Sequence, residues 1–342
     1  MSQQRKSVRV VIVNWRTPLL TERAARSLWP QLQAGDELVV VDNASASADP
    51  HDNSLAHLRQ LGAQLGSAGP ARFGLVQSRR NGGFGYGVNL GARNLRQDAL
   101  VLLNSDAYAL EGFVDALTAP LGHDLVEATT ARLLLEGRWR LVGDGAEAQT
   151  EPAATTQSTG SAQLRGLDGG IWVSDPSGVE LINSTGNVVD ACGNGHDRSW
   201  LAPAKQEHDS PEVFGICGGA CAISARAWRQ LGGMRQDLFM YYEDTDFSYR
   251  LRRSGYSVEY VRQAQARHAH AASSDSASEA FTTWNTRNRL RVAARYAPPS
   301  VAVRALVNTG GRMLLGPQRQ ARAQGLVQAL AHAPQDLYAR IG

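Results

Sequence analysis

Short apolar runs alternate with helix-like patterns through the first hundred residues of the chain. An apolar run of this length is typical of a strand that is covered on both faces. Four such runs predict strands at residues 8–14, 38–41, 73–77 and 99–103. Helical spacing follows Thr17-Pro18 and also a glycine-rich turn, whose helix is expected to run to Arg96. This alternation predicts an α/β fold with a mostly parallel, Rossmann-like sheet and helices on both faces.

The pattern changes in the rest of the chain. Between residues 136 and 170 it fades into Gly, Ala, Thr, Gln and Ser, which predicts a polar, flexible insertion. This insertion would divide one domain, residues 1–290, into a first half (8–135) and a second half (171–290). In the second half we expect helices at 225–231 and 245–254 and a strand at 257–261.

A basic, amphipathic helical tail is predicted over residues 291–342. From Arg287 onward the chain has nine arginines and one acid, Asp336, with leucines and valines between them. Such a helix would bind an anionic membrane surface, where each Lys or Arg contributes about 1 kcal/mol. The same pattern also fits a helix that packs back on the domain, or one that mediates a homodimer.

Composition narrows the class of protein. The 342 residues have 35 Lys and Arg against 32 Asp and Glu, so wholesale coating of nucleic acid is not expected. No run approaches the roughly 20 apolar residues that span a bilayer, and no secretory signal is recognised at the N-terminus. The three cysteines cannot build a disulfide framework, and Cys217 and Cys221 are expected to be small buried thiols. We therefore expect a cytoplasmic protein, either free or peripheral at the inner face of the cell membrane.

Polar side chains follow three of the predicted strands where each strand ends, at Asn14, at Asp42-Asn43 and at Asn104 to Asp106. Parallel α/β sheets bind ligands just beyond the carboxyl ends of their strands. The glycine-rich turn within residues 81–91 would let the backbone approach a phosphate or a sugar. Its glycines lack the dinucleotide-binding spacing, and the sequence has no P-loop motif, so neither of those classes is predicted.

Two groups of carboxylates are candidates for chemistry. Asp106 stands at the ligand edge and could hold Mg²⁺ or Mn²⁺ beside a diphosphate, although a lone aspartate more often caps a turn. Glu243 and Asp244 are adjacent, and their crowding in an aromatic surround could raise a carboxyl pKa toward that of a general base. Asp244 is expected at or before the N-cap of a helix, on which Asp246 and Arg250 are spaced for an ion pair.

His268 and His270 follow the strand expected at 257–261. Alternation places both side chains on one face of an extended segment. A neutral imidazole is a good ligand for a transition metal, and these two histidines would stand beside the possible metal site at Asp106. A surface histidine without such a neighbour is more often inert.

Eight motifs follow one another between residues 8 and 291. They are VIVNW (11–15), VVVDNAS (39–45), NGGFGYGVNLGAR (81–93), LLNSDA (102–107), GICGGACAISARAW (215–228), FMYYEDTDFSYRLRRSGY (239–256), RHAHAASS (267–274) and TRNRLR (286–291). In this order they resemble the inverting family-2 glycosyltransferases of GT-A fold, in particular the bacterial rhamnosyltransferase-like branch. The resemblance implies transfer of rhamnose or another hexose from a dTDP-, UDP- or GDP-linked donor. The acceptor would be a hydroxyl of a glycan or of a lipid-linked acceptor in polysaccharide or cell-wall biosynthesis.

The resemblance also implies roles for parts of the chain and for individual residues. Residues 8–135 would be the nucleotide-sugar-binding half, and residues 171–290 the acceptor and catalytic half. Asp244 matches the general base, and His270 best matches a metal-ligand histidine, with His268 as the alternative. Asn104 stands where the family usually has its first metal-binding carboxylate, so only Asp106 can supply one. The acceptor or sugar pocket would include Gly218, Gly219 and Glu243. Donor binding is implied for Asn14, Trp15, Asp42, Asn43, Asn81, Gly82, Gly83, Gly87, Asn104 and Asp106.

Two other classes compete with the transferase hypothesis. A catalytically degenerate nucleotide-sugar-binding or scaffold protein would account for the missing first carboxylate at Asn104. A sugar-phosphate nucleotidyltransferase would need a basic, glycine-rich loop after the first strand. The chain has Trp15-Arg16-Thr17-Pro18 there, which disfavours that class.

Overall fold

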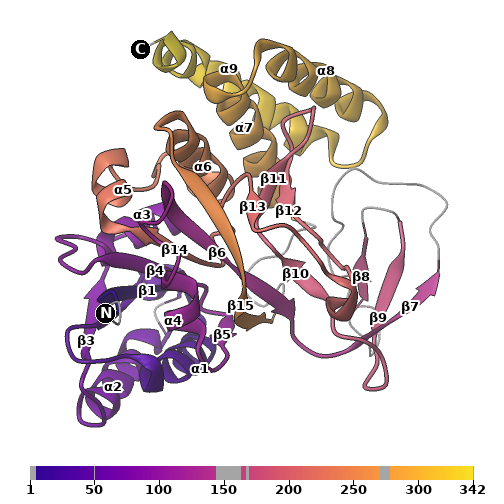
Figure 1. Cartoon of the computed structure of the whole chain (residues 1–342). Helices are drawn as coiled ribbons and strands as arrows, with labels where there is room; N and C mark the ends of the chain where they lie inside the picture. Colours follow the sequence, from indigo (N-terminus) through magenta and orange to yellow (C-terminus); the bar gives the residue numbers. More distant parts are fainter. Residues whose placement is uncertain (1–4, 50, 144–162, 167–168, 270–277, 342) are drawn as a thin grey trace.

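The computed structural model describes residues 5–49, 51–143, 163–166, 169–269 and 278–341. A large central sheet dominates the structure (Figure 1). Its strands are β1 (Val8–Asn14), β2 (Glu37–Asp42), β3 (Arg72–Gln77), β4 (Ala99–Leu103), β5 (Ala107–Ala109), β6 (Val126–Leu135), β10 (Ile182–Ser184), β13 (Glu212–Val213), β14 (Ala220–Ser224) and β15 (Ser257–His268). They lie in the order β13-β15-β6-β14-β4-β1-β2-β3, with β10 paired to β6 and β5 paired to β15.

The first four strands in the chain form a parallel unit. β2 and β4 both pair in parallel with β1, and β3 pairs in parallel with β2. The chain therefore adds strands on one side of β1 and then returns to its other side at β4. A reversal of this kind leaves a crevice at the carboxyl ends of the two central strands, where ligands bind in such sheets. All four strands predicted in this half are confirmed.

Helices cover both faces of the sheet, as predicted. They are α1 (Pro18–Leu28), α2 (Ser54–Gly66), α3 (Phe84–Gly91), α4 (Phe113–Thr118), α5 (Ala225–Leu231) and α6 (Glu243–Arg253). Side chains of β1 alternate between the two faces: Val10 and Ile12 pack in the same core as α1, α2 and α4, whereas Val11 packs with α3, α5 and α6. The helix that the sequence predicted to reach Arg96 ends at Gly91. Asn94 has a left-handed φ of 55°, which is incompatible with a right-handed helix through that residue.

Two small sheets extend the second half of the chain. One contains β7 (Trp139–Gly143), β9 (Ile171–Ser174) and β8 (Gln163–Arg165), and the other is the hairpin of β11 (Asn187–Val189) and β12 (Gly195–Asp197). β7 and β8 fall within the insertion predicted at 136–170 and were not expected from its composition. Residues 144–162 and 167–168 of that insertion lie outside the described residues.

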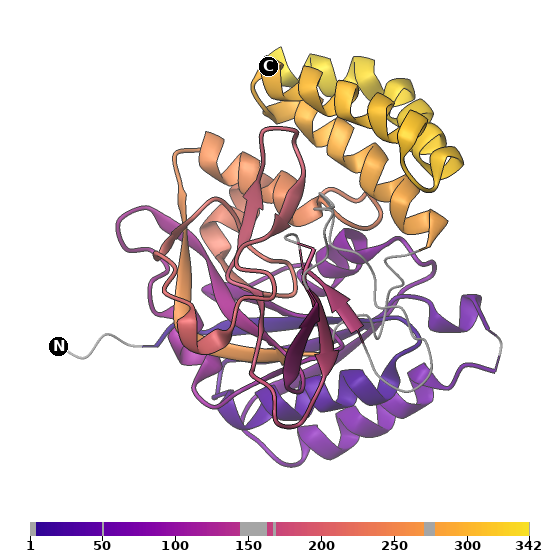
Figure 2. The ribbon, with the colours of Figure 1, turned by 90° about the vertical axis from the view of Figure 1, so that its right-hand side faces the viewer.

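The predicted tail forms helices that pack above α6 and the β11–β12 hairpin (Figures 1 and 2). They are α7 (Glu279–Tyr296), α8 (Pro299–Leu315) and α9 (Arg319–Ile341), and the boundary predicted at residue 291 falls inside α7. Arg289 and Arg291 of the basic segment are only 1% and 2% exposed. Arg291 donates to Asp336 across 2.8 Å, so part of the predicted positive charge is internal. Within the described ranges no helix is both long and apolar enough to cross a bilayer.

Candidate functional site

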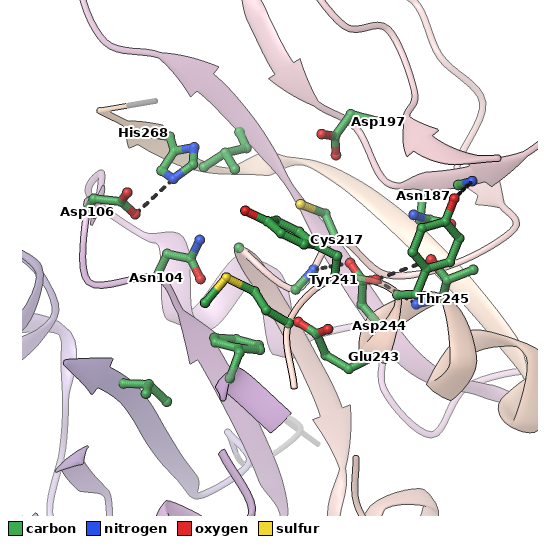
Figure 3. Close-up of a pocket in the computed structure, with 18 of the residues that line it drawn as sticks. Asn104, Asp106, Asn187, Asp197, Cys217, Tyr241, Glu243, Asp244, Thr245 and His268 are labelled. Atoms are coloured by element: carbon green, nitrogen blue, oxygen red, sulfur yellow. Dashed lines mark hydrogen bonds and ion pairs between the residues drawn. The ribbon is translucent and has the colours of Figure 1, made fainter. Parts of the chain in front are cut away.

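A cavity of about 360 Å³ lies at the carboxyl ends of β1 and β4 (Figure 3). Its wall includes ten of the residues singled out in the sequence, which are Trp15, Asn43, Asn81, Asn104, Asp106, Gly218, Gly219, Glu243, Asp244 and His268. Five others do not line it: Asn14, Asp42, Gly82, Gly83 and Gly87. His270 lies outside the described residues.

Asn14 and Asp42 lie behind the cavity wall. Both are almost completely buried, and Asn14 Nδ2 donates to Asp42 Oδ1 across 2.9 Å. Asp42 Oδ1 also accepts a hydrogen bond from the Ser45 hydroxyl. The next residue, Asn43, faces the cavity and donates to Asn81 Oδ1, which joins the end of β2 to the glycine-rich turn. In this structure Asn14 and Asp42 therefore bond to each other behind the wall, and the Asn14 carbonyl accepts a hydrogen bond from the Asn43 N–H.

Asp106 and His268 meet at one end of the cavity, although they are far apart in the sequence. β5 pairs with β15, and this pairing brings His268 Nε2 to 2.9 Å from Asp106 Oδ1. The other ring nitrogen, Nδ1, lies 2.6 Å from Asn183 Oδ1. Burial disfavours the charged imidazole, but the attraction and hydrogen bond to Asp106, together with the charge of Asp197, raise the pKa of His268 above its usual value. Among the described residues no group of three or more His, Cys, Asp or Glu side chains is arranged to hold a metal.

Asp244 occupies the first turn of α6 and faces the cavity. Its Oδ2 accepts a hydrogen bond from the Gly218 N–H at 3.1 Å, and its Oδ1 accepts from the Thr245 N–H at 2.6 Å. The sequence placed Asp244 at or before the N-cap, but the cap is Tyr242 in a left-handed conformation. The helix therefore begins at Glu243, and Asp244 is its second residue. The helix ion pair is confirmed, with Arg250 Nε 2.7 Å from the fully buried Asp246.

Burial gives the adjacent carboxyls unusual acidities. Burial, reinforced by the charge of Asp244, raises the pKa of Glu243 to about 8. Burial also raises the pKa of Asp244, while the N–H groups of Gly218 and Thr245 act in the opposite direction. At neutral pH Glu243 is therefore the protonated member of the pair, and Asp244 keeps the hydrogen bonds that favour a carboxylate.

The cavity also contains residues that sequence reasoning missed. Asn183, Asn187, Asp197 and Trp200 line it from β10 and from the β11–β12 region. Burial raises the pKa of Asp197, and the nearby charge of Asp244 acts in the same direction. No motif marked these residues because a long-range pairing of very short strands brings them to the site.

The lining is rich in carboxyl groups, although the imidazoles of His196 and His268 also belong to it. Four carboxyl groups line the cavity: Asp106, Asp197, Glu243 and Asp244. Across the described part of the chain, the lining includes no lysine or arginine. Cys217 also lines the cavity, and burial raises the pKa of its thiol well above the ordinary value, so it is not a thiolate there.

The fold is the GT-A fold of glycosyltransferases, as predicted. The structure of the mannosyltransferase PcManGT from Pyrobaculum calidifontis in complex with GDP-Man and Mn²⁺ matches with a TM-score of 0.51 at 15% identity, over 96% of this chain and 76% of that one. GalNAc-T7 with UDP, GalNAc and Mn²⁺ matches with a TM-score of 0.58 at 14% identity, over 99% of this chain and 58% of that one. At such identities the likeness concerns the fold alone.

A sequence match supports the rhamnosyltransferase-like resemblance. The chain is 32% identical over 121 residues to the N-acetylglucosaminyl-diphospho-decaprenol L-rhamnosyltransferase of Mycobacterium tuberculosis, in strains CDC 1551 / Oshkosh and ATCC 25618 / H37Rv. The match covers 34% of this chain and 39% of that relative, well under two thirds of its length. No protein-family model matches the chain.

Glu243→Gln tests the acidity of the buried carboxyl. Between pH 4.5 and about 8 the folded protein holds a proton at Glu243 that the unfolded chain has lost, so the free energy of unfolding falls as pH rises through this window. The variant has no such proton, so its free energy of unfolding should fall less across the same pH window. The difference from the wild type should be about 1.4 kcal/mol for each unit by which the folded and unfolded pKa values of Glu243 differ. Urea unfolding at several pH values in that window measures the slopes. Glu212→Gln is the control, because Glu212 is exposed on β13, and it should have the slope of the wild type. The same slope in Glu243→Gln would contradict the raised pKa of Glu243.

Proposed function

We propose that the protein is an inverting glycosyltransferase that moves a sugar from a nucleotide-diphosphate donor to an acceptor hydroxyl. The observation that carries this proposal is a single cavity in a GT-A fold, which joins the donor-side residues to Asp244. Asp244 takes the proton of the acceptor hydroxyl as general base. The oxygen attacks the anomeric carbon from the face opposite the diphosphate, the bond from that carbon to the phosphate oxygen breaks, and its electron pair leaves on the diphosphate.

The charge of the cavity supports a divalent metal, Mg²⁺ or Mn²⁺, in this reaction. A diphosphate is an anion, and the described lining offers it carboxyl groups but no lysine or arginine. The carboxylate of Asp106 and the imidazole of His268 converge, and both are ligand types that Mn²⁺ accepts. Asn183 holds the far side of the imidazole, as outer partners of metal-bound histidines do. When bound, the cation would neutralise charge on the departing diphosphate.

The relatives suggest the substrates. The Mycobacterium tuberculosis relative is named for L-rhamnosyl transfer to a decaprenol-linked N-acetylglucosamine, and the structural neighbours are complexes with GDP-Man or with UDP. By analogy, the donor would be rhamnose or another hexose on dTDP, UDP or GDP. The acceptor would be a glycan or a lipid-linked glycan, as in cell-wall polysaccharide biosynthesis.

Donor binding tests the metal site. A panel of UDP-, dTDP- and GDP-sugars is titrated by calorimetry with Mn²⁺, Mg²⁺ or EDTA. We expect one nucleoside class to bind. Both EDTA and Asp106→Ala should weaken that binding by about 10–100-fold or more, because mutation of a residue that only supports a metal ligand already lowers metal affinity by such a factor. Glu111→Gln, which changes an exposed carboxylate outside the cavity, should bind as the wild type does. Failure to bind any nucleotide sugar would refute the transferase proposal.

Turnover tests the general base. Asp244→Asn keeps the size of the side chain but cannot accept the acceptor proton, so kcat should fall about 10²–10⁴-fold. Donor affinity should stay the same, because the donor does not need the base to bind. The assay is release of nucleoside diphosphate with octyl glycosides as acceptors. Wild-type protein that binds donor and never turns over would instead indicate a catalytically degenerate binding or scaffold protein.

The outer helices support contact with an anionic membrane. α8 and α9 expose large apolar side chains, among them Val307 (71%), Leu314 (72%), Leu315 (88%) and Tyr338 (81%). Their one acid, Asp336, is buried and paired with Arg291, so the exposed charge of the two helices comes from arginines. Exposed apolar surface beside positive charge complements an anionic lipid surface. We therefore propose that this face binds phospholipid.

Flotation with vesicles tests this contact. Vesicles containing phosphatidylglycerol should carry the protein upward, and vesicles of phosphatidylcholine alone should carry much less. Leu315→Asp should reduce flotation severalfold, because it places a carboxylate among the lipid-facing side chains. Leu125→Asp is the matched control, since Leu125 is 60% exposed in a loop before β6. Equal flotation on both lipids, or a stable dimer that Leu315→Asp dissociates, would refute the proposal.

A further inference from the structure

The cavity has a second wall that none of the sequence motifs assigns. Asn187, Asp197 and Trp200 come from the β11–β12 hairpin and the residues that follow it. In Figure 3, Asp197 and Asn187 lie on the side of the cavity away from Asn104 and Asp106. The donor-side and hairpin-side residues therefore face the same space from two directions, and Asp244 lines that space as well.

Two buried oxygen atoms in the cavity wall have no hydrogen-bond partner. Asn187 is 7% exposed and its Oδ1 is unpaired, and Glu243 is 8% exposed with its Oε2 unpaired. An unsatisfied buried polar group costs about 1–3 kcal/mol, so each such atom calls for an explanation. Both residues line the cavity, but the two oxygen atoms are themselves covered, so a hydroxyl group of a ligand can donate to them only after the side chains turn toward the cavity.

The charges on this wall define the ligand that fits. Asp197 adds a carboxyl group, and the described lining holds no lysine or arginine to balance it. Neither a carboxylate nor a protonated carboxyl group compensates the charge of a phosphate or carboxylate ligand, whereas hydroxyl groups can hydrogen-bond to the carboxyl group in either form. Trp200 supplies an aromatic surface, and its indole N–H is fixed 3.3 Å from the Arg165 carbonyl. A ring that is rich in hydroxyl groups and has an apolar face matches these features.

The hairpin is held rigidly against the catalytic segment. The buried Arg289 donates to Asn194 Oδ1 across 2.9 Å, and Gly195 N–H donates to the Tyr242 hydroxyl at 3.0 Å. Tyr242 directly precedes Glu243 and Asp244. A ligand on the hairpin wall is therefore held at a fixed position relative to the base, which is the positioning that attack by a hydroxyl requires.

We propose that Asn187, Asp197 and Trp200 form the acceptor subsite, and that the acceptor presents an uncharged sugar ring there with its reacting hydroxyl toward Asp244. This inference rests on the proposed transferase function. It adds the location of the acceptor and the requirement that the acceptor ring be neutral.

Saturation-transfer NMR on the full chain, with diamagnetic Mg²⁺ and the nucleoside diphosphate that the calorimetry identifies, tests the subsite. The probes are octyl β-glucoside, octyl β-N-acetylglucosaminide and octyl β-glucuronide, of which only the last is charged. We expect at least one neutral glycoside to bind and the glucuronide to bind about tenfold more weakly or not at all. Asp197→Asn should weaken the neutral glycoside about tenfold, as loss of one hydrogen bond to a charged group does, and should reduce discrimination against the glucuronide.

Variants and controls separate this inference from the proposed function. Asn187→Leu is a second variant on the same wall, and Glu212→Gln is the control outside the cavity. The nucleotide signals of all variants should match the wild type, which shows that the donor site is intact. Equal binding of the glucuronide, unchanged glycoside binding in both wall variants, or no glycoside binding in protein that binds nucleotide would overturn the subsite. Loss of nucleotide binding in the wild type would instead overturn the proposed function.

Discussion

The placement of the site depends on the strained segment Leu238 to Tyr242. Phe239, Tyr241 and Tyr242 all have φ between 67° and 70°, a conformation that costs about 1–3 kcal/mol for each such residue. The buried Asn288 of α7 lies within 2.9 Å of the carbonyls of Leu238, Met240 and Tyr241. On the other side, a Cβ at Gly83 would lie 1.8 Å from the Phe239 carbonyl oxygen, so only glycine allows this approach. The segment thus joins the glycine-rich turn, Asp244 and the C-terminal helices.

The second constraint is electrostatic. Four carboxyl groups line a cavity in which the described residues provide no lysine or arginine. A diphosphate in such a cavity meets no lysine or arginine, which is why we propose a divalent cation as its counter-charge. The carboxyl group of Asp197 likewise offers hydrogen bonds to hydroxyl groups but no counter-charge to an anion. The same composition of the lining therefore motivates both proposals, the metal on the donor and the uncharged ring of the acceptor.

Local pattern predicted the parallel half of the sheet because its strands are continuous apolar runs, as at residues 8–14 and 99–103. It also placed Asp106 at the ligand edge, because that residue follows a predicted strand, whereas Asp244 was linked to the site by the family resemblance. It could not find Asp197 or Asn187, because the two strands of that hairpin have only three residues each. Nor could it show that Arg289 and Arg291 are buried, because a basic helix has the same composition whether its arginines face solvent or pair internally.

The central claim is that the diphosphate of a nucleotide sugar binds beside Asp106 with a divalent cation. A crystal structure of the protein with donor and Mn²⁺, with anomalous data collected at the manganese edge, tests it most directly. The account predicts one manganese peak within coordinating distance of Asp106 and His268 that also touches the diphosphate. A diphosphate bound without manganese, or a manganese ion away from Asp106, would contradict it.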